Sequence, residues 1–486
     1  MKKVLLIGNG AREHVIAETL KRSPQEVELF VVGSATNPGI KILAKEYVTG
    51  DILNLDFVKE FALKVKPDFC IVGPEAPIAA GMVDGFEGAG FKCCSPFKTV
   101  GRLESSKSFT RDLLEKYKIP GNPRFKVFTS EEGGVEVGSV SKESKVDDGE
   151  GVERTGNEKI VSDKTMQELS KFFDELGENF VVKADGLKGG KGVKVSGDHL
   201  HGKEEGMAYA RECLKESGRV VVEEKLIGQE FSLMSFCDGI HIATMPAVQD
   251  HKRAYEGDKG PNTGGMGTYS DADHSLPFLS ESDIFEASEI TRKVAKALYD
   301  ETGVYFKGVM YGGFIAVRDG VRLIEYNARF GDPEAMNVLP LLKTDFVSIC
   351  EAIIDGTLGK LDVKFEKKAT VCKYLVPEGY PDHPCKGQRI TIKNAGLGES
   401  VASSAAQNGI SGVKIYYASV DQKEDGLYLS GSRAVAFVGI ADTLEEAEKL
   451  AESAVSSVEG PVFYRKDIGT KELIQKRVEH MREIRK

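Results

Sequence analysis

The chain has 486 residues, of which 41% are hydrophobic and 29% are charged, and its formal net charge is −10 at pH 7. This length exceeds what one core usually supports, so we expect roughly two to four domains. The acidic balance without a long basic block argues against nucleic acid as the main partner, and no run of roughly 18 apolar residues is present that would span a membrane.

The N-terminal part of the chain alternates between short apolar strands and helices. We predict strands at 4–7, 27–32 and 69–72, a helix that continues to Leu20 after the first strand, and a helix at 57–65. Strands that alternate with helices indicate a parallel sheet with crossover helices. The sequence therefore predicts a doubly wound α/β domain at this end.

A glycine turn, Gly8-Asn9-Gly10, lies between the first predicted strand and its helix. Such a turn places backbone N–H groups at a helix N-terminus, where they bind phosphate. A dinucleotide fingerprint would require a third glycine at position 13, which is Glu13, so a single phosphate bound with the help of Arg12 fits better. A tight turn that binds no ligand is the alternative interpretation.

The next segment contains a predicted helix and a polar stretch. We predict a helix at 104–118, opening at Glu104. Residues 131–163 are rich in glycine, serine and acidic side chains, and this composition cannot bury a core. We therefore expect a disordered surface insertion at 131–163, with structure resuming in a helix at Met166.

The run KADGLKGGKGV, which begins at Lys183, is the most informative part of the chain. It lies between two predicted strands, and a hairpin of this kind can close over a triphosphate with its backbone N–H groups. It is not a P-loop, because no GxxxxGK[ST] occurs and the loop leads into a strand. The candidate nucleotide residues here are Lys183, Gly189, Gly190, Lys191 and Gly192. A mobile hairpin with solvated lysines is the alternative.

An apolar stretch that ends in acidic residues and a turn follows at 221–231. This pattern suits a strand edge that binds adenine through backbone groups at Glu224, Lys225 and Leu226. The carboxylate of Glu230 would then accept hydrogen bonds from ribose hydroxyls. Because many surface strands also end in charged turns, the pattern has only moderate specificity.

Glu325 and Asn327 are two residues apart on a predicted strand, so their side chains share one face. Mg²⁺ takes oxygen ligands of this kind, with nucleotide phosphates and water completing its coordination. Arg329 follows and places a guanidinium beside the predicted metal site. An exposed strand with alternating polar residues is the alternative.

The density of motifs falls after about residue 345. We predict strands near 369–376, 413–418 and 433–439, a helix at 443–457, and a charged helical tail at 470–485 that is solvated. The eight cysteines are scattered without a CxxC motif, which predicts reduced thiols that fill cores in a cytoplasmic protein.

Taken in this order, the motifs resemble the ATP-grasp superfamily, and within it the glycinamide ribonucleotide synthetase (phosphoribosylamine–glycine ligase) family. The narrower resemblance rests on GNGAREH at 8–14, GPEAP at 73–77, QDHKR at 249–253, PNTGGMG at 261–267, RFGDPE at 329–334 and RKDIG at 465–469. It covers nearly the whole chain. The sequence departs from the family at Ala11 and Ser95, where glycine is usual, and in the insertion at 131–163.

The resemblance implies a ligase that uses ATP with Mg²⁺ or Mn²⁺ to join glycine to 5-phosphoribosylamine through glycyl phosphate. It also implies a fold class, α/β multidomain. The domains would be an N-terminal Rossmann-like domain at 1–103, an ATP-grasp domain at 104–345 with a mobile lid at about 121–222, and a small α+β C-terminal domain at 346–486.

Specific roles follow from the same resemblance. The implied catalytic residues are Arg329, Asp250 and Lys252. Lys107 joins the nucleotide-binding residues, and Glu325 and Asn327 remain the metal ligands. The implied substrate-binding residues are Gly10, Arg12, Glu75, Gly264, Gly265, Met266 and Asp332. The hairpin at 186–192 would act as a lid that keeps water from the acyl phosphate.

Three other functions are consistent with part of the sequence. Another ATP-grasp ligase or carboxylase of the purine pathway would share the lysines and the metal strand but not the runs at 249–253 and 261–267. Glu13 disfavours a nicotinamide dehydrogenase, and the intact candidate site disfavours an inactive binding protein. We expect small-molecule substrates, no nucleic-acid or membrane partner, and a monomer or weak homodimer.

Overall fold

The computed structural model describes residues 1–130, 161–189, 192–393 and 412–486. The chain divides into two units, one formed by Met1–Pro123 with Leu226–Lys486 and the other by Arg124–Lys225. The second unit covers most of the segment predicted as a lid. Within the described ranges, no helix is long and apolar enough to cross a membrane.

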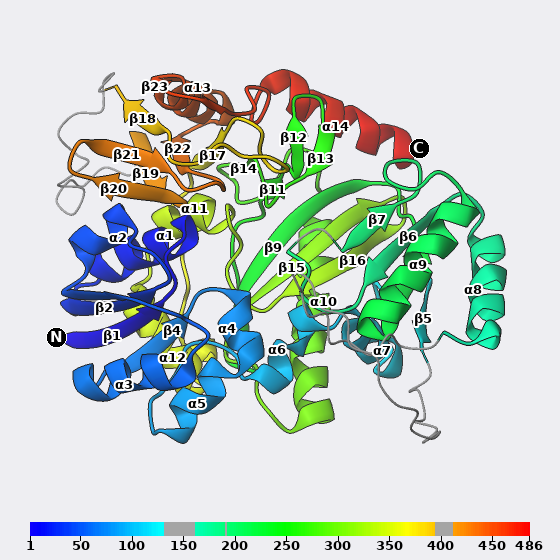
Figure 1. Cartoon of the computed structure of the whole chain (residues 1–486), viewed down its shortest axis with the longest axis horizontal. Coiled ribbons are helices and arrows are strands. Elements are labelled where there is room, and N and C mark those ends of the chain that lie inside the picture. The colour runs from blue at the N-terminus through cyan, green and yellow to red at the C-terminus, as the bar shows by residue number, and fades with distance from the viewer. Residues whose placement is uncertain (131–160, 190–191, 394–411) are drawn as a thin grey trace, which may run out of the picture. The chain divides into compact units, whose positions relative to one another are not determined.

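A parallel four-stranded sheet forms the N-terminal part of the first unit (Figure 1). Its order is β3-β2-β1-β4, and each neighbouring pair is parallel, as predicted. Val4 and Leu6 belong to one hydrophobic core, and Leu5 and Ile7 to another, so the apolar run of β1 is continuous because both of its faces are buried. The elements are β1 (Lys2–Ile7), α1 (Ala11–Lys21), β2 (Val27–Gly33), α2 (Pro38–Leu43), β3 (Glu46–Thr49), α3 (Leu55–Val65), β4 (Phe69–Val72), α4 (Glu75–Ala80) and α5 (Met82–Gly88).

The single helix predicted at 104–118 is wrong, because two helices occupy this region. They are α6 (Lys98–Ser105) and α7 (Lys107–Lys116). Ser106 separates them with extended backbone angles, and its hydroxyl accepts a hydrogen bond from Phe109 N at 3.2 Å. This is an N-cap interaction, which starts α7 and leaves Glu104 in the last turn of α6.

An antiparallel sheet of order β10-β9-β15-β16 lies further along the first unit. Its strands are β9 (Gln229–Cys237), β10 (Ile242–Thr244), β15 (Gly308–Val317) and β16 (Gly320–Asn327). The long helix α10 (Glu281–Thr302) packs on this sheet with a buried stripe that includes Ile290, Val294 and Leu298. β16 carries the predicted metal residues at its end.

A six-stranded sheet joins the segment after β10 to the C-terminal region. The path β11-β14-β17-β22-β19, with β24 beside β17, contains strands from both sides of the domain boundary predicted at 345–346. The strands are β11 (Gln249–Asp250), β14 (Gly267–Ser270), β17 (Ala369–Pro377), β19 (Gly412–Tyr417), β22 (Val435–Ala441) and β24 (Val462–Phe463). Helix α13 (Leu444–Val455) packs against β17 and β22.

Shorter elements complete the first unit. They are β12 (Arg253–Tyr255), β13 (Lys259–Asn262), α11 (Ala335–Val338), α12 (Phe346–Asp355), β18 (Arg389–Ile392), β20 (Val420–Lys423), β21 (Gly426–Leu429), β23 (Val458–Glu459) and α14 (Lys471–Ile484), with 3₁₀ turns at Leu339–Leu341 and Leu358–Lys360. All eight cysteines are free thiols, and seven of them are buried, in line with the prediction.

The second unit is an antiparallel sheet with two helices. The sheet has the order β5-β8-β6-β7, and the rings of Phe173 and Phe180 meet edge to face in its core at 4.7 Å. α8 begins at Asp163, three residues before the predicted start, because Ser162 caps it. Residues 131–160 of the predicted insertion lie outside the described residues. The elements are β5 (Phe125–Thr129), α8 (Asp163–Leu176), β6 (Phe180–Ala184), β7 (Val193–Val195), α9 (Lys203–Ser217) and β8 (Arg219–Glu224).

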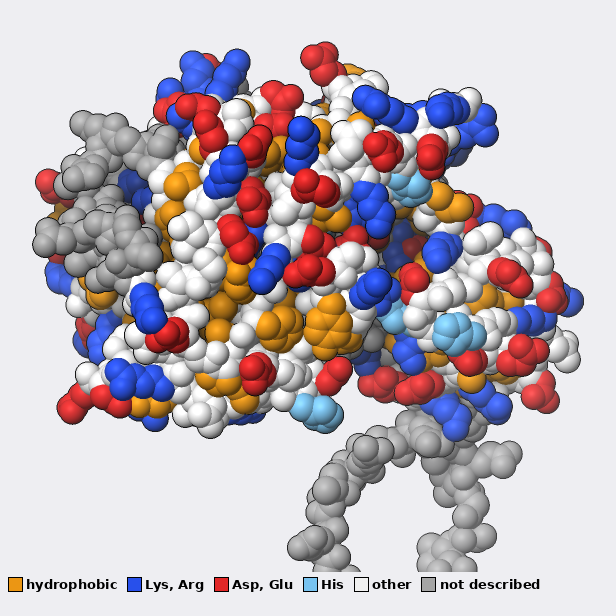
Figure 2. Space-filling view, turned by 90° about the horizontal axis from the view of Figure 1, so that it is seen from above, with side chains coloured by type: hydrophobic (Ala, Val, Ile, Leu, Met, Phe, Trp, Pro, Cys, Tyr) orange, Lys and Arg blue, Asp and Glu red, His pale blue; other side chains and the backbone are white. Residues whose placement is uncertain are grey.

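Acidic and basic side chains are interspersed over the face of the molecule shown in Figure 2. This pattern agrees with the lack of a long basic block in the sequence.

The prediction that the charged C-terminal tail is solvated is wrong. α14 packs against the first unit near β9 and β15, with Leu473 and Met481 buried. Ile474 and Val478 extend the same contact, and Arg485 pairs with Asp283 at 2.6 Å. A narrow apolar stripe is sufficient for this packing, although most residues of the helix are charged or polar.

Met481→Ala tests this packing. Removing a buried methionine side chain leaves a cavity, so we expect a loss of about 2 kcal/mol in the free energy of unfolding. Lys476→Ala, on the exposed side of the same helix, is the matched control and should change it by less than about 0.5 kcal/mol. Urea unfolding measures both. Equal midpoints for Met481→Ala and the unmodified chain would mean that α14 is not docked in solution.

Candidate active site

The predicted nucleotide hairpin lies in the second unit, between β6 and β7. Ala184 N donates a hydrogen bond of 2.8 Å to Gly192 O, which closes the hairpin. Gly189 has φ +55°, in the left-handed region that favours glycine. Gly190 and Lys191 fall outside the described residues. The strand–turn–strand arrangement is therefore present, and the nucleotide contacts of the turn stay a prediction.

Lys183, near the end of β6, is buried with 3% of its surface exposed. Its Nζ forms an ion pair with Glu223 of β8, which is also buried. A buried ammonium group requires such a partner, because it has lost its hydration. The pair holds Lys183 in a fixed position at the base of the glycine hairpin.

The residues predicted to contact adenine and ribose divide between the two units. In the second unit, Glu224 Oε1 accepts a hydrogen bond from Arg124 N at 2.8 Å, and Lys225 Nζ donates one to Ser196 O at 2.8 Å. In the first unit, Leu226 is half-buried and Glu230 is exposed at the start of β9. The side chains of Glu224 and Lys225 thus have a structural role of their own.

Glu325 and Asn327 lie on one side of β16, as the spacing predicts, while Tyr326 between them is buried. Lys252 Nζ is 3.5 Å from Glu325 Oε1, and Arg329 Nη2 donates to Asn327 Oδ1 at 3.2 Å. In the part of the chain that the structure describes, no group of three His, Cys, Asp or Glu side chains could hold a metal ion alone. A metal at this pair would need oxygen ligands from another molecule, such as nucleotide phosphates.

Arg329, whose side chain is 16% exposed, is the centre of a partly buried network of charges. Its Nη2 is 2.8 Å from Glu104 Oε1 of α6, and its Nε is 3.3 Å from Glu75 Oε2 of α4. Burial raises the pKa of Glu104. Burial would also raise the pKa of Glu75, but the charges of Arg329 and Arg12 outweigh it and lower that pKa to about 2. Two acidic side chains therefore fix the guanidinium beside the predicted metal ligands.

The glycine turn before α1 is filled by Glu13. Gly10 N donates to Glu13 Oε2 at 2.7 Å, and Arg12 Nε donates to Glu13 Oε1 at 2.6 Å. A Cβ atom at Gly8 or Gly73 would lie 2.7 Å or 2.2 Å from the side chain of Glu13, so both positions require glycine. The carboxylate thus occupies the helix N-terminus, where the sequence predicts a phosphate. Ala11 has no positive φ, so its departure from glycine causes no backbone strain.

Arg12 belongs to the same network. It is buried, its Nη1 donates to Phe330 O at 3.4 Å, and it lies 3.9 Å from Glu75 Oε2. Arg12 therefore connects α1 to the segment that carries Arg329 and to α4. Its predicted role in binding a phosphate stays a prediction.

Asp250 and Lys252 lie on either side of the buried His251. Burial, together with the nearby carboxylate of Glu334, raises the pKa of Asp250 well above its ordinary value. Glu325 is the main cause of a raised pKa at Lys252, which keeps that ammonium group charged. The site thus contains a carboxyl group that can retain a proton and a cation that does not lose one.

The predicted substrate residues of the 261–267 and 329–334 runs are brought together. A Cβ atom at Gly265 would lie 2.8 Å from Pro333 Cδ and 2.7 Å from Asp250 Oδ1, and one at Gly10 would lie 3.7 Å from Asp332 Oδ2. Met266 differs from the others, since its side chain is fully buried in the core. Lys107 begins α7 and is half-buried.

Several residues of this site had no signal in the sequence. Arg433 and Tyr374, from the C-terminal region, both contact Asp332. Glu334 accepts hydrogen bonds from Tyr311 Oη at 2.5 Å and Ser232 Oγ at 3.0 Å. Glu334 belongs to the run at 329–334 that the sequence analysis identified. Arg433, Tyr374, Tyr311 and Ser232 lie on distant strands or loops without a motif, so only their position in the fold identifies them.

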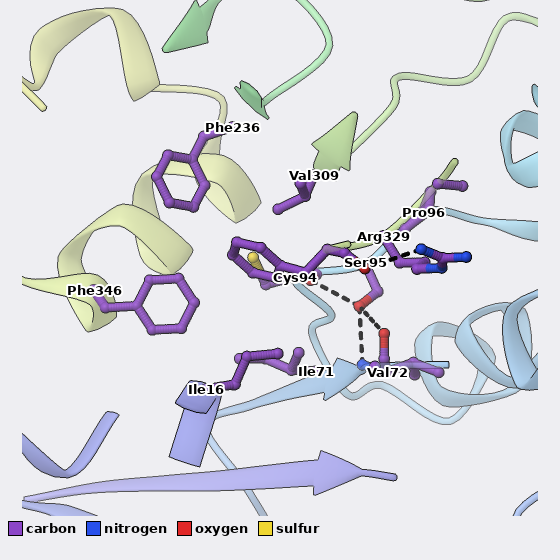
Figure 3. Close-up of a pocket in the computed structure, with 13 residues that line it drawn as sticks. Ile16, Ile71, Val72, Cys94, Ser95, Pro96, Phe236, Val309, Arg329 and Phe346 are labelled. Atoms are coloured by element: carbon purple, nitrogen blue, oxygen red, sulfur yellow. Dashed lines mark hydrogen bonds between the residues drawn. The ribbon is translucent and has the colours of Figure 1, made fainter. Parts of the chain in front are cut away.

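A small space of about 20 Å³ lies beside Arg329 (Figure 3). Apolar side chains line most of it, among them Ile16, Phe236 and Phe346. A space of this size holds about one water molecule. It is therefore too small to be a substrate pocket.

The family models that match the chain are those of phosphoribosylglycinamide synthetase. The N domain matches residues 2–104, the ATP-grasp (A) domain residues 145–335, and the C domain residues 370–471. The chain is 46% identical to a phosphoribosylamine–glycine ligase of Methanocaldococcus jannaschii over 100% of both chains. It is 44% identical to the ligase of the same name from Methanosarcina barkeri, over 99% of this chain and 100% of the relative.

Solved structures of similar fold point to the same architecture. The crystal structure of a phosphoribosylamine–glycine ligase from Thermotoga maritima aligns with a TM-score of 0.71 at 26% identity, covering 96% of this chain and 99% of that one. The biotin carboxylase domain of a 2-oxoglutarate carboxylase from Hydrogenobacter thermophilus aligns with a TM-score of 0.65 at 16% identity, over 99% of this chain and 94% of that domain. The second likeness concerns the fold alone.

Glu75→Gln tests the charge network. Because the pKa of Glu75 is lowered to about 2 from its ordinary value of 4.5, the ionised carboxylate stabilises the folded state above about pH 4.5, and this contribution is lost as the pH falls toward 2. We expect Glu75→Gln to lower the free energy of unfolding at pH 7 and to remove part of its decline below pH 4.5. Urea unfolding at several pH values measures this, with the exposed Glu60→Gln as control. If the free energy of unfolding depended on pH in the same way for Glu75→Gln and the unmodified chain, Glu75 would not take part in a stabilising charge network.

Proposed function

The chain belongs to the phosphoribosylglycinamide synthetase family, and on this premise we propose how its residues carry out the ligation of glycine. It is an ATP-dependent phosphoribosylamine–glycine ligase of purine biosynthesis. The observation that carries this assignment is the 46% identity to such a ligase over the full length of both chains. The likeness to a biotin carboxylase domain, at 16% identity, gives much weaker support to a carboxylase.

The reaction has two steps. The carboxylate of glycine attacks the γ-phosphate of ATP, which gives glycyl phosphate and ADP. The amine of 5-phosphoribosylamine then attacks the acyl carbon and displaces phosphate, giving glycinamide ribonucleotide. The first step is necessary because oxide is a poor leaving group, whereas phosphate is a good one. Phosphoryl transfer mainly requires alignment and neutralisation of negative charge.

We assign the neutralisation of the triphosphate to Lys183 and Lys107. The fixed position of Lys183 on β6, paired with Glu223, supports this role. The glycine hairpin at 189–192 would cover the phosphates through its backbone N–H groups. Glu224, Lys225, Leu226 and Glu230 stay the proposed contacts for adenine and ribose.

Glu325 and Asn327 fit a divalent metal, Mg²⁺ or Mn²⁺, because both offer oxygen atoms from one side of β16. When bound there with nucleotide phosphates, the metal would neutralise the charge of the triphosphate. Arg329, held by Glu75 and Glu104, would stabilise the transferring phosphoryl group through a guanidinium that does not need to reorganise.

Asp250 is suited to accept the proton that the attacking amine releases, since a raised pKa makes its ionised carboxylate a stronger base. Lys252 would offset negative charge beside it. The proposed contacts for glycine and phosphoribosylamine are Gly10, Arg12, Glu75, Gly264, Gly265, Met266 and Asp332.

Three properties of the protein stay predictions. They are a cytoplasmic location, the absence of a nucleic-acid partner, and the state of a monomer or weak homodimer.

The identity of the nucleotide product tests the reaction. We expect ADP and inorganic phosphate at full rate only with glycine and 5-phosphoribosylamine together, compared with each substrate alone. Formation of AMP and pyrophosphate, or a rate that does not depend on phosphoribosylamine, would exclude the proposed reaction.

Asn327→Leu tests the metal ligands. Leu keeps a similar volume but removes the oxygen atom, so we expect a loss of activity of roughly 100-fold or more with little change in the thermal midpoint. Asn327→Asp, which keeps an oxygen ligand, is the control and should retain more activity. Full turnover of Asn327→Leu with an unchanged dependence on Mg²⁺ would remove Asn327 from the metal site.

A further inference from the structure

Arg433, two residues before β22, connects two segments of the candidate site. Its Nη1 lies within hydrogen-bonding distance of three backbone carbonyl oxygens: Gly264 O at 2.7 Å, Asp332 O at 2.9 Å and Gly265 O at 3.2 Å. Its Nη2 is 3.3 Å from Asp332 Oδ1. One guanidinium group thus joins the glycine turn at 264–265 to the segment that carries Arg329 and Asp332.

Tyr374 of β17 holds Arg433 and Asp332 in place. Arg433 Cζ lies 4.5 Å from the centre of the Tyr374 ring, a distance that allows a cation–π interaction. The hydroxyl of Tyr374 donates a hydrogen bond of 2.8 Å to Asp332 Oδ1. Burial opposes the charge of Arg433, but Asp332 and Tyr374 raise its pKa, so the guanidinium stays charged.

The two glycines of the turn allow this close approach. A Cβ atom at Gly264 would lie 3.1 Å from Arg433 Cζ, and one at Gly265, which has φ +113°, would lie 2.7 Å from Asp250 Oδ1. The turn is therefore held tightly between Arg433 and Asp250. Any displacement of Arg433 would allow it to move.

The carboxylate of Asp332 is oriented by these contacts. Arg433 and Tyr374 both bind Oδ1, whereas Oδ2 lies on the side of Gly10, 3.7 Å from where a Cβ would be. A carboxylate held by one oxygen can present the other to hydrogen-bond donors of a ligand. The glycine substrate carries an ammonium group, and phosphoribosylamine carries ribose hydroxyls, so both offer donors of this kind.

We propose that Arg433 is a positioning residue for the substrates other than ATP, which fixes the turn at Gly264–Gly265 and turns Asp332 Oδ2 toward their donor groups. The inference rests on the proposed function and adds to it a residue from the C-terminal region. Arg433 acts through these contacts, since its Nη1 is engaged by carbonyl groups and its Nη2 faces Asp332. Its removal should therefore change substrate affinity more than the phosphoryl-transfer chemistry.

Steady-state kinetics of Arg433→Met in the full chain tests the proposal. We expect the KM for glycine or for phosphoribosylamine to rise roughly 10-fold, with a smaller effect on kcat and less than about a 2-fold change in the KM for ATP. The substrate whose KM rises identifies the donor that Asp332 binds. Arg433→Lys, which keeps the charge but can make fewer of the hydrogen bonds, should fall between Arg433→Met and the unmodified enzyme.

Arg22→Met is a matched control for the loss of structure. Arg22 also donates to two neighbouring carbonyls, Pro340 O at 3.1 Å and Leu339 O at 2.6 Å, but contacts none of the candidate site residues. We expect this variant to lose stability and to keep all three KM values. Three results would overturn the proposal. The KM values of Arg433→Met could be unchanged, the KM values for glycine, phosphoribosylamine and ATP could rise equally, or Arg22→Met could show the same rise in KM as Arg433→Met.

If Arg433→Met does not fold, Tyr374→Phe is used in the same kinetic experiment. It removes only the hydroxyl that binds Asp332 Oδ1, so the same KM should rise by a smaller factor, and an unchanged KM would overturn the proposal. If the unmodified chain formed no ADP with glycine and phosphoribosylamine, the proposed function itself would fail, which is a distinct result.

Discussion

The pairing of Arg329 with Glu75 and Glu104 is the constraint on which the candidate site depends. A guanidinium that is mostly buried must be matched by carboxylates, because it has lost most of its hydration. Glu75 begins α4, Glu104 lies in the last turn of α6, and Arg329 follows β16. The pairing therefore fixes the N-terminal part of the first unit against the sheet that carries Glu325 and Asn327. It also places the guanidinium of Arg329 beside Asn327, one of the two proposed metal ligands.

Acidic side chains fill places where a ligand could otherwise bind. Glu13 takes up the helix N-terminus behind Gly8 and Gly10, and Glu223 neutralises Lys183 in the second unit. Each of these carboxylates keeps a neighbouring cation or turn rigid before any substrate binds. Catalysis of phosphoryl transfer benefits from such an arrangement, because groups that are already oriented do not need to reorganise during the reaction.

The sequence was sufficient where local pattern determines structure. The apolar runs of β1, β2 and β4 predict the parallel sheet, and the two-residue spacing of Glu325 and Asn327 predicts their shared side of β16. The break at Ser106 and the docking of α14 were missed, because one capping serine and a narrow apolar stripe are weak signals among charged residues. Arg433 and Tyr374 could not be found, since their contacts with Asp332 join segments far apart in the chain.

The six-stranded sheet limits where the polypeptide can be cut into fragments. β14 pairs with β17 on one side and β11 on the other, although β14 and β17 lie on opposite sides of the boundary that the sequence suggests. A fragment that stops near residue 345 would leave β14 as an open edge, with a row of unpaired N–H and C=O groups available to another chain. Such a truncation would be prone to self-association, so permutations and fusions of this enzyme should keep both halves of the sheet in one polypeptide.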